Sequence, residues 1–260
     1  MKASDLDVRW VGDGPPVVLI HGSVVGAERT WRHQLTLAEQ WSLCIPNRPG
    51  FGESPPLPRG DFELEAPLIA ELLGDGAHLV GHSYGAVIAL YAAALRPHAV
   101  RSLTISEPGC LRVAAGMELV DLQIANGERL YELAGALEPL KFLQAFRGGV
   151  GSTHATPAEL SGELLHGARL LMHERPPWQA DPPLEALASA AFPKLVISGG
   201  HSPVFDAVCD RVADRIGARR AVISGRGHTI PANGEPYNEL LHAFLADSES
   251  GRTPRPQAPR

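Results

Sequence analysis

Short apolar runs alternate with longer amphipathic segments through most of the chain. Runs rich in Val, Ile and Leu occur at residues 17–20, 42–45, 77–80, 102–105, 194–197 and 221–224. Such runs are typical of strands that are covered on both faces, and the segments between them have helical spacing. The pattern predicts an α/β fold with a mostly parallel central sheet flanked by helices.

The alternation stops between residues 109 and 191, where no convincing strand is found but helical spacing continues. The capping box "TPAE" predicts a helix that opens at Thr156 and runs toward Met172. Apolar spacing over residues 117–137 predicts one kinked helix or two short helices on either side of Gly127.

These patterns divide the chain into a core, an insertion and a tail. We expect a core at 1–108 and 192–246, interrupted by a helical lid at 109–191. The alternative for the insertion is an extra structural layer with no part in binding. Residues 247–260 are rich in Pro, Ser and Arg and contain no large apolar residue, which predicts a disordered tail.

Composition narrows the classes of partner. A hydrophobic content of 44% is enough for one large core. The 23 basic residues are scattered and outnumbered by 29 acidic ones, which argues against nucleic acid. The three cysteines are far apart, which argues against a disulfide framework or a zinc site. The amino terminus has no apolar core, and the longest apolar run, 86–95, is too short to cross a membrane. We expect a cytoplasmic protein.

The sequence Gly81-His82-Ser83-Tyr84-Gly85 is a G-x-S-x-G motif between a predicted strand and a predicted helix. In that setting a sharp turn holds the serine hydroxyl out of the sheet, and the glycines allow strand and helix to approach closely. The amide of Tyr84 then points toward a developing oxyanion. An ordinary strand-to-helix turn is the alternative, and the motif's context favours a catalytic Ser83.

Three further motifs occur in a characteristic order around this turn. They are "VVLIHGS" at 17–23, "PNRPGFGES" at 46–54 and "GRGHTIPANGEPYNELLHAFL" at 225–245. Together with the serine motif they resemble the α/β-hydrolase superfamily. The resemblance implies that the amides of Ser23 and Tyr84 form an oxyanion hole and that His228 is the general base.

The acid that would orient His228 is not at its usual position. In this superfamily it commonly lies three residues past the glycine that ends a late strand, and here that residue is Ser202. Glu107 directly follows a predicted buried strand, at the edge where open α/β sheets build their sites. We predict that Glu107 is the acid. Asp206 or Asp210, or a dyad without an acid, are the alternatives.

These residues predict a serine hydrolase that forms an acyl-enzyme, with no metal or cofactor implied. We expect it to cleave an ester or lactone of a small hydrophobic molecule. The alternatives are hydrolysis of a carbon–carbon bond next to a ketone, and a ligand receptor with little turnover. Candidate substrate-binding residues are Val24, Phe142, Phe146, Met172 and Trp178.

Overall fold

The computed structural model describes residues 1–153, 155–160 and 162–251. Within these residues one sheet has the strand order β1-β3-β2-β4-β5-β6-β7, and only the β1–β3 pair is antiparallel. The predicted α/β class with a mostly parallel sheet is confirmed. The strands are β1 (Val8–Val11), β2 (Pro16–Ile20), β3 (Ser42–Pro46), β4 (Ala77–His82), β5 (Val100–Ser106), β6 (Lys194–Ser198) and β7 (Arg219–Val222).

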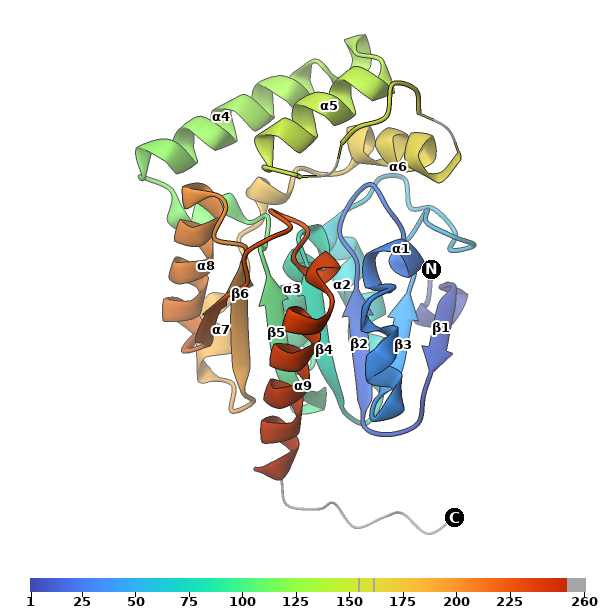
Figure 1. Cartoon of the computed structure of the whole chain (residues 1–260), viewed down its shortest axis with the longest axis vertical. Coiled ribbons are helices and arrows are strands. Elements are labelled where there is room, and N and C mark those ends of the chain that lie inside the picture. The colour runs from blue at the N-terminus through green and yellow to red at the C-terminus, as the bar shows by residue number, and fades with distance from the viewer. Residues whose placement is uncertain (154, 161, 252–260) are drawn as a thin grey trace.

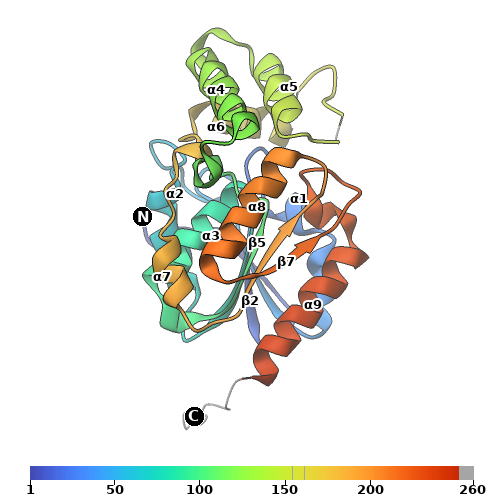
Figure 2. The ribbon, with the colours of Figure 1, turned by 90° about the vertical axis from the view of Figure 1, so that its left-hand side faces the viewer.

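Helices cover both faces of the sheet. Figure 2 shows α1 and α9 on one face and α2, α3, α7 and α8 on the other. The helices are α1 (Ala27–Trp31), α2 (Phe62–Leu72), α3 (Tyr84–Leu95), α4 (Glu118–Glu132), α5 (Pro139–Gly149), α6 (Gly162–His173), α7 (Leu184–Ser189), α8 (Pro203–Ile216) and α9 (Glu235–Ser250).

Five of the six predicted runs lie within strands, and the sixth, 221–224, overlaps β7 at residues 221 and 222. The strand that the pattern does not predict is β1. It lies at the edge of the sheet and pairs with β3 alone, and Arg9 and Trp10 are exposed. An edge strand need not be apolar on both faces, so it lacks the signal that identifies the others.

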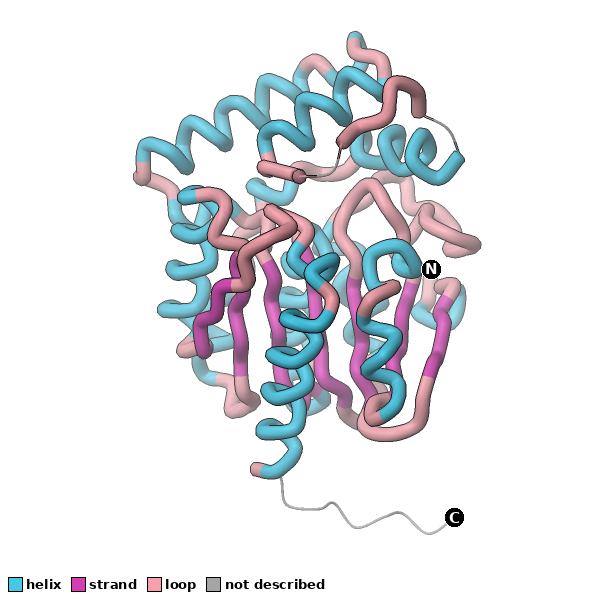
Figure 3. The backbone as a smooth tube through the Cα atoms, in the orientation of Figure 1, coloured by secondary structure: helices cyan, strands magenta, loops and turns pink. Residues whose placement is uncertain are grey.

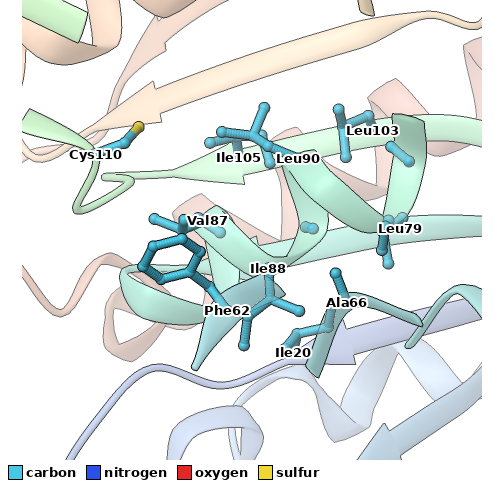
Figure 4. Packing of buried hydrophobic residues seen from close by; sticks show 14 of the residues in the cluster. Ile20, Phe62, Ala66, Leu79, Val87, Ile88, Leu90, Leu103, Ile105 and Cys110 are labelled. Carbon is cyan, nitrogen blue, oxygen red and sulfur yellow. The ribbon is translucent and has the colours of Figure 1, made fainter. Parts of the chain in front are cut away.

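The pleat of each central strand divides its side chains between two cores. In β2, Val18 and Ile20 pack with the helices α2 and α3, whereas Val17 and Leu19 pack on the side of α1 and α9. Figure 4 shows the first of these cores, including Ile20, Phe62, Leu79, Val87, Ile88, Leu90, Leu103 and Ile105. Helices on both faces explain why these strands carry almost continuous apolar runs.

The segment between β5 and β6 contains no strand among its described residues, and its helices α4, α5 and α6 lie above the carboxyl edge of the sheet (Figure 1). Figure 3 shows loops of the core between this edge and the helices. The helices pack around a third, smaller apolar core, which includes Val24 of the turn after β2 as well as Phe142, Leu143, Leu164, Ala168 and Leu171. This segment is therefore placed over the ends of the strands, where α/β folds build their sites.

Two local predictions within this segment are revised. Helix α6 begins at Gly162 and not at Thr156, whose hydroxyl instead accepts a hydrogen bond from Arg147 at 3.3 Å. Helix α4 runs through Gly127 without a break. A Cβ at Gly127 would lie 2.6 Å from the Trp178 ring, so this glycine serves close packing and not a helix break.

The predicted tail begins too early. Helix α9 continues to Ser250, four residues beyond the predicted boundary. The reason is tertiary, because Ser248 is buried and donates to the Phe244 carbonyl at 2.7 Å, and Glu249 pairs with Arg101 at 3.0 Å. Residues 252–260 lie outside the described part of the chain.

The described residues contain no helix that is long and apolar enough to span a membrane.

The two ends of α3 provide a test of the core. Leu90 has no exposed surface, whereas 55% of Leu95 is exposed on the same helix. We expect Leu90→Ala to lower the free energy of unfolding by about 2–5 kcal/mol, because it removes buried apolar atoms and leaves a cavity. Urea denaturation of both variants would measure this. A loss as large in the matched control, Leu95→Ala, would contradict the assigned packing.

Candidate active site

The turn from β4 to α3 holds Ser83 in a strained conformation. Its φ of 57° and ψ of −119° lie outside the regions that most residues adopt. A Cβ at Gly81 would lie 2.5 Å from the Gly85 carbonyl oxygen, and one at Gly85 would lie 2.3 Å from that of His21. Both positions therefore require glycine, and the close approach of strand and helix forces the serine out of the sheet.

His228 links Ser83 to Glu107. The Nε2 atom of His228 lies 2.8 Å from Ser83 Oγ, and its Nδ1 atom lies 2.6 Å from Glu107 Oε2. The ring packs against Phe205, with 4.5 Å between the ring centroids. If Nδ1 carries the proton and donates it to Glu107, Nε2 is free to accept the hydroxyl proton of Ser83. This arrangement is a hydrogen-bonded relay from a hydroxyl to a carboxylate.

Glu107 is held by more than His228. Its side chain is fully buried, and its Oε1 atom accepts a hydrogen bond from the Gly199 amide at 2.6 Å. Burial alone raises the pKa of Glu107, but the hydrogen bond and charge of His228 and the Gly199 amide outweigh it, so the pKa lies below its ordinary value. Glu107 is therefore held as a carboxylate.

The alternative acids have other partners. Asp206 lies 3.5 Å from Arg220 and accepts a hydrogen bond from the Ser198 hydroxyl, and Asp210 accepts one from Arg220 at 2.8 Å. Ser202 precedes α8 as its N-terminal flanking residue, although its side chain makes no capping hydrogen bond. Of the acidic residues weighed from the sequence, only Glu107 contacts His228.

Backbone strain is concentrated around this relay. Among the described residues other than glycine, the ones with positive φ are Val24 at 77°, Ser83 at 57° and Glu107 at 42°. Each such residue costs of the order of 1–3 kcal/mol and persists only when its surroundings hold it in place. All three follow strands of the sheet, at the edge where the relay lies.

The turn after β2 runs directly past the serine. A Cβ at Gly22 would lie 3.0 Å from Ser83 Cβ. The inserted segment also lies very close to this turn. A Cβ at Gly167 of α6 would lie 1.7 Å from the Val24 carbonyl oxygen, so only glycine fits there. Tyr84 begins α3, where the first amides of a helix have no carbonyl partner within the helix. Ser23 lies in the wall of the adjoining cavity, and Tyr84 directly follows Ser83.

A buried ion-pair network lies behind this turn. Arg48 Nε lies 2.8 Å from Glu65, and its Nη2 atom lies 2.8 Å from Glu174, which follows α6. Arg48 also donates to the Gly22 carbonyl at 2.9 Å, and the hydroxyl of Ser23 donates to Glu174 at 2.5 Å. The network therefore joins the turn after β2 to α2 and to the inserted segment.

Two carboxylates share one guanidinium in this network. Burial by itself lowers the pKa of Arg48, but Glu65 and Glu174 outweigh it and raise the pKa further above its ordinary value. Burial, with the negative charge of Glu174, raises the pKa of Glu65. Arg48 therefore stays charged, and it lies 4.2 Å from the centroid of the Tyr84 ring.

A cavity of about 150 Å³ adjoins the relay. Its lining includes Gly22, Ser23, Val24, Val25, Arg29, Thr30, Arg32, His82, Ser83, Phe146, Arg147, Val150, Ser152, His228, Thr229 and Ala232. The volume is below the roughly 300 Å³ at the lower end of common ligand pockets. The cavity suits a small ligand.

Of the substrate-binding candidates, Val24 and Phe146 line this cavity. Phe142, Met172 and Trp178 do not, and their prediction is corrected. Phe142 is fully buried in the core of the inserted segment, and Met172 packs against the same core. Trp178 is buried against Tyr131, with 5.2 Å between the ring centroids. Apolar spacing alone cannot distinguish a residue that packs helices together from one that faces a cavity.

Comparisons with known proteins agree with this fold. The family model for the alpha/beta hydrolase fold matches residues 15–132. An alpha/beta hydrolase from Sphaerobacter thermophilus superposes with a TM-score of 0.70 at 24% identity, over 94% of this chain and 99% of that one. The chain therefore has the α/β-hydrolase fold, and residues 15–132 match the family model for that fold.

Curated proteins that are similar to this chain include two named pimeloyl-[acyl-carrier protein] methyl ester esterase. The chain is 34% identical over 180 residues to that of Methylococcus capsulatus, covering 66% of this chain and 65% of the relative. It is 37% identical over 101 residues to that of Chromobacterium violaceum, covering 39% and 40%. The matched regions therefore span less than two thirds of either relative's length.

The sequence patterns missed several residues around this site. His201 Nδ1 lies 3.3 Å from Glu107, and His201 Nε2 lies 3.1 Å from the Val150 carbonyl oxygen. Its position just after Gly199 and Gly200, at the end of β6, is a signal that could have found it. Glu65 and Glu174 carry no comparable signal, because their roles depend on meeting Arg48 from distant parts of the chain.

Two histidines beside Ser83 are buried in a neutral form. His21 Nε2 accepts a hydrogen bond from the Arg48 amide at 2.9 Å, and burial and the charge of Arg48 lower the pKa of His21 to about 3. His82 Nε2 lies 2.8 Å from the His228 carbonyl oxygen, and burial and the charge of His228 lower the pKa of His82 to about 4. Both rings therefore contribute hydrogen bonds as neutral groups.

The described residues contain no group of three or more side chains arranged to hold a metal ion.

The ion-pair network predicts a large loss of stability when its cation is removed. We expect Arg48→Met to lower the free energy of unfolding by about 3–5 kcal/mol, because two buried carboxylates lose their counter-charge. Urea denaturation would measure it. The matched control is Arg112→Met, which breaks an exposed pair with Glu128 and should cost about 0–1 kcal/mol. Equal losses in the two variants would contradict the role assigned to Arg48.

The lowered pKa of His82 predicts a stability change with pH. Between about pH 6.5 and pH 4 this histidine takes up a proton in the unfolded chain but not in the folded one, so acidification favours unfolding. At one pKa unit per about 1.4 kcal/mol, the cost reaches about 3 kcal/mol at pH 4. Urea denaturation across this range should give a shallower pH dependence for His82→Gln than for the wild type. An unchanged slope would contradict a buried, neutral His82.

Proposed function

We propose that this chain is a serine hydrolase that cleaves a carboxylic ester or lactone of a small molecule through an acyl-enzyme on Ser83. The observation that carries the proposal is the relay in which 2.8 Å separates Ser83 Oγ from His228 Nε2 and 2.6 Å separates His228 Nδ1 from Glu107. A nucleophile, a base and an orienting acid are the groups that acyl transfer requires.

In the proposed reaction Ser83 attacks the ester carbonyl while His228 Nε2 takes the hydroxyl proton. Glu107 stabilises the imidazolium that forms and holds the ring in the tautomer that accepts at Nε2. His228 then gives the proton to the leaving alcohol, whose bond to the acyl carbon breaks. A water molecule attacks the acyl-enzyme with His228 as base, which releases the acid and restores Ser83.

The oxyanion would be held by backbone amides on either side of Ser83. The amide of Tyr84 lies at the amino terminus of α3, where helix geometry leaves donors without partners and the dipole favours negative charge. The amide of Ser23 belongs to the turn that Arg48 and Glu174 hold through the Gly22 carbonyl and the Ser23 hydroxyl. Preorganised donors of this kind commonly contribute about 10²–10³-fold to the rate.

Two observations support ester hydrolysis over the alternatives. The relatives from Methylococcus capsulatus and Chromobacterium violaceum are named as methyl ester esterases. Strain is retained at Ser83 and Glu107, and a receptor without turnover would gain stability by losing it.

The relay predicts which substitutions abolish turnover. We expect Ser83→Ala to eliminate turnover of 4-nitrophenyl esters, and Glu107→Gln to lower kcat by about 10²–10⁴-fold, because a neutral amide cannot stabilise the imidazolium. Steady-state kinetics and labelling by a fluorophosphonate probe would measure these effects. Asp206→Asn is the matched control, because it removes a carboxylate that faces Arg220, and it should keep kcat within about threefold.

Two results would contradict the proposal. If Ser83→Ala hydrolyses a broad ester panel as fast as the wild type, the chain does not act through this serine. If Asp206→Asn loses activity and Glu107→Gln keeps it, the acid is assigned to the wrong residue.

A further inference from the structure

The cavity beside Ser83 is positively charged, although the chain as a whole has a net charge of −6. Arg29, Arg32 and Arg147 line it, and no aspartate or glutamate does. Arginines scattered over a surface are ordinary. Three arginines at one small cavity beside a candidate nucleophile indicate an anionic ligand.

The three arginines come from two distant parts of the fold. Arg29 lies in α1 and Arg32 follows that helix, three residues later, so the two side chains project from the same side. Arg147 lies in α5 of the inserted segment and faces the same cavity from above. The set of three positive charges is therefore complete only when the inserted segment covers the core.

Arg32 and Arg147 have neutral hydrogen-bond partners. Arg32 Nε lies 3.0 Å from His33 Nε2, and Arg147 Nη1 lies 3.3 Å from both the Ala155 carbonyl oxygen and the Thr156 hydroxyl. Among the described residues no ion pair within 4.0 Å is found for these three arginines. Burial, followed by the charge of Arg29, lowers the pKa of Arg147, so the two guanidinium groups repel each other.

The lining of the cavity also has an apolar part. Val24, Val25, Phe146 and Val150 contribute hydrocarbon to the same cavity. A ligand that matches both parts carries an apolar chain and an oxyanion, and guanidinium groups bind carboxylates and phosphates in paired hydrogen bonds.

We propose that Arg29, Arg32 and Arg147 select an ester substrate that carries a free carboxylate or phosphate group at the end of a short apolar chain. The inference rests on the proposed function, since it places the scissile carbonyl at Ser83. It narrows the expected small hydrophobic molecule to one with an acidic end.

The test compares two esters of equal length, the mono-4-nitrophenyl ester of adipic acid and 4-nitrophenyl hexanoate. The readout is the ratio of their kcat/KM values after subtraction of the rate with Ser83→Ala. We expect the wild type to favour the acidic ester by about tenfold or more, as one charge-assisted hydrogen bond allows. The ratio should fall as salt is raised, because the arginines are partly exposed.

Substitutions of the arginines test whether the preference for the acidic ester arises in this cavity. Arg29→Gln and Arg147→Gln should each lower the ratio at least threefold, and Arg147→Lys should retain more of it than Arg147→Gln because the positive charge remains. The matched control is Arg211→Gln, which removes the same charge from the exposed surface of α8 and should keep the wild-type ratio. Competition by adipate and by butyl phosphate against the neutral ester tells which acid the arginines prefer.

The outcomes separate the two proposals. If neither ester is cleaved faster by the wild type than by Ser83→Ala, the proposed function fails. If the hexanoate ester is cleaved but the ratio is one or less, or is the same in Arg29→Gln, Arg147→Gln and Arg211→Gln, the arginine site is overturned and the esterase proposal stands.

Discussion

One buried guanidinium connects the parts of this molecule that must meet for a site to exist. Arg48 follows β3 and contacts Glu65 in α2, Glu174 beyond α6 and the carbonyl of Gly22. A buried cation cannot be left without counter-charge, so the loop, the helix and the inserted segment are tied to one arrangement. The turn that carries Ser23 is positioned by the same contacts.

This tie has a second consequence for the turn after β2. Val24 adopts a positive φ of 77°, which is costly for a β-branched residue, and α6 approaches its carbonyl so closely at Gly167 that no side chain would fit. The strain at Val24, like that at Ser83 and Glu107, is offset by the packing around it. Rigid surroundings and strained residues therefore occur together at the carboxyl edge of the sheet.

The inserted segment does more than cover this edge. It supplies Glu174 to the ion-pair network and Arg147 to the cavity, so both the support of the turn and the charge of the cavity depend on it. An insertion that only shielded the core would need neither residue. In the proposed function, the core provides the reacting groups and the insertion helps to choose the substrate.

The sequence by itself determined the sheet, the turn at Ser83 and the loop of His228. These features depend on local chemistry: apolar runs for strands covered on both faces, glycines where backbones approach, and residue order along the chain. It also favoured Glu107 over Asp206 and Asp210 as the partner of His228, because the carboxyl ends of parallel strands meet at one edge. The edge strand β1 and the end of α9 were missed because their signals are weak or absent locally.

Only the tertiary structure decided which side chains meet. It brought Glu107, rather than Asp206, to His228, and paired Asp206 with Arg220. It placed Phe142 in a core and Phe146 at the cavity, although both lie on the same helix four residues apart. Distances between residues far apart in the chain depend on how helices and strands pack, and a local pattern of apolar and polar positions does not contain them.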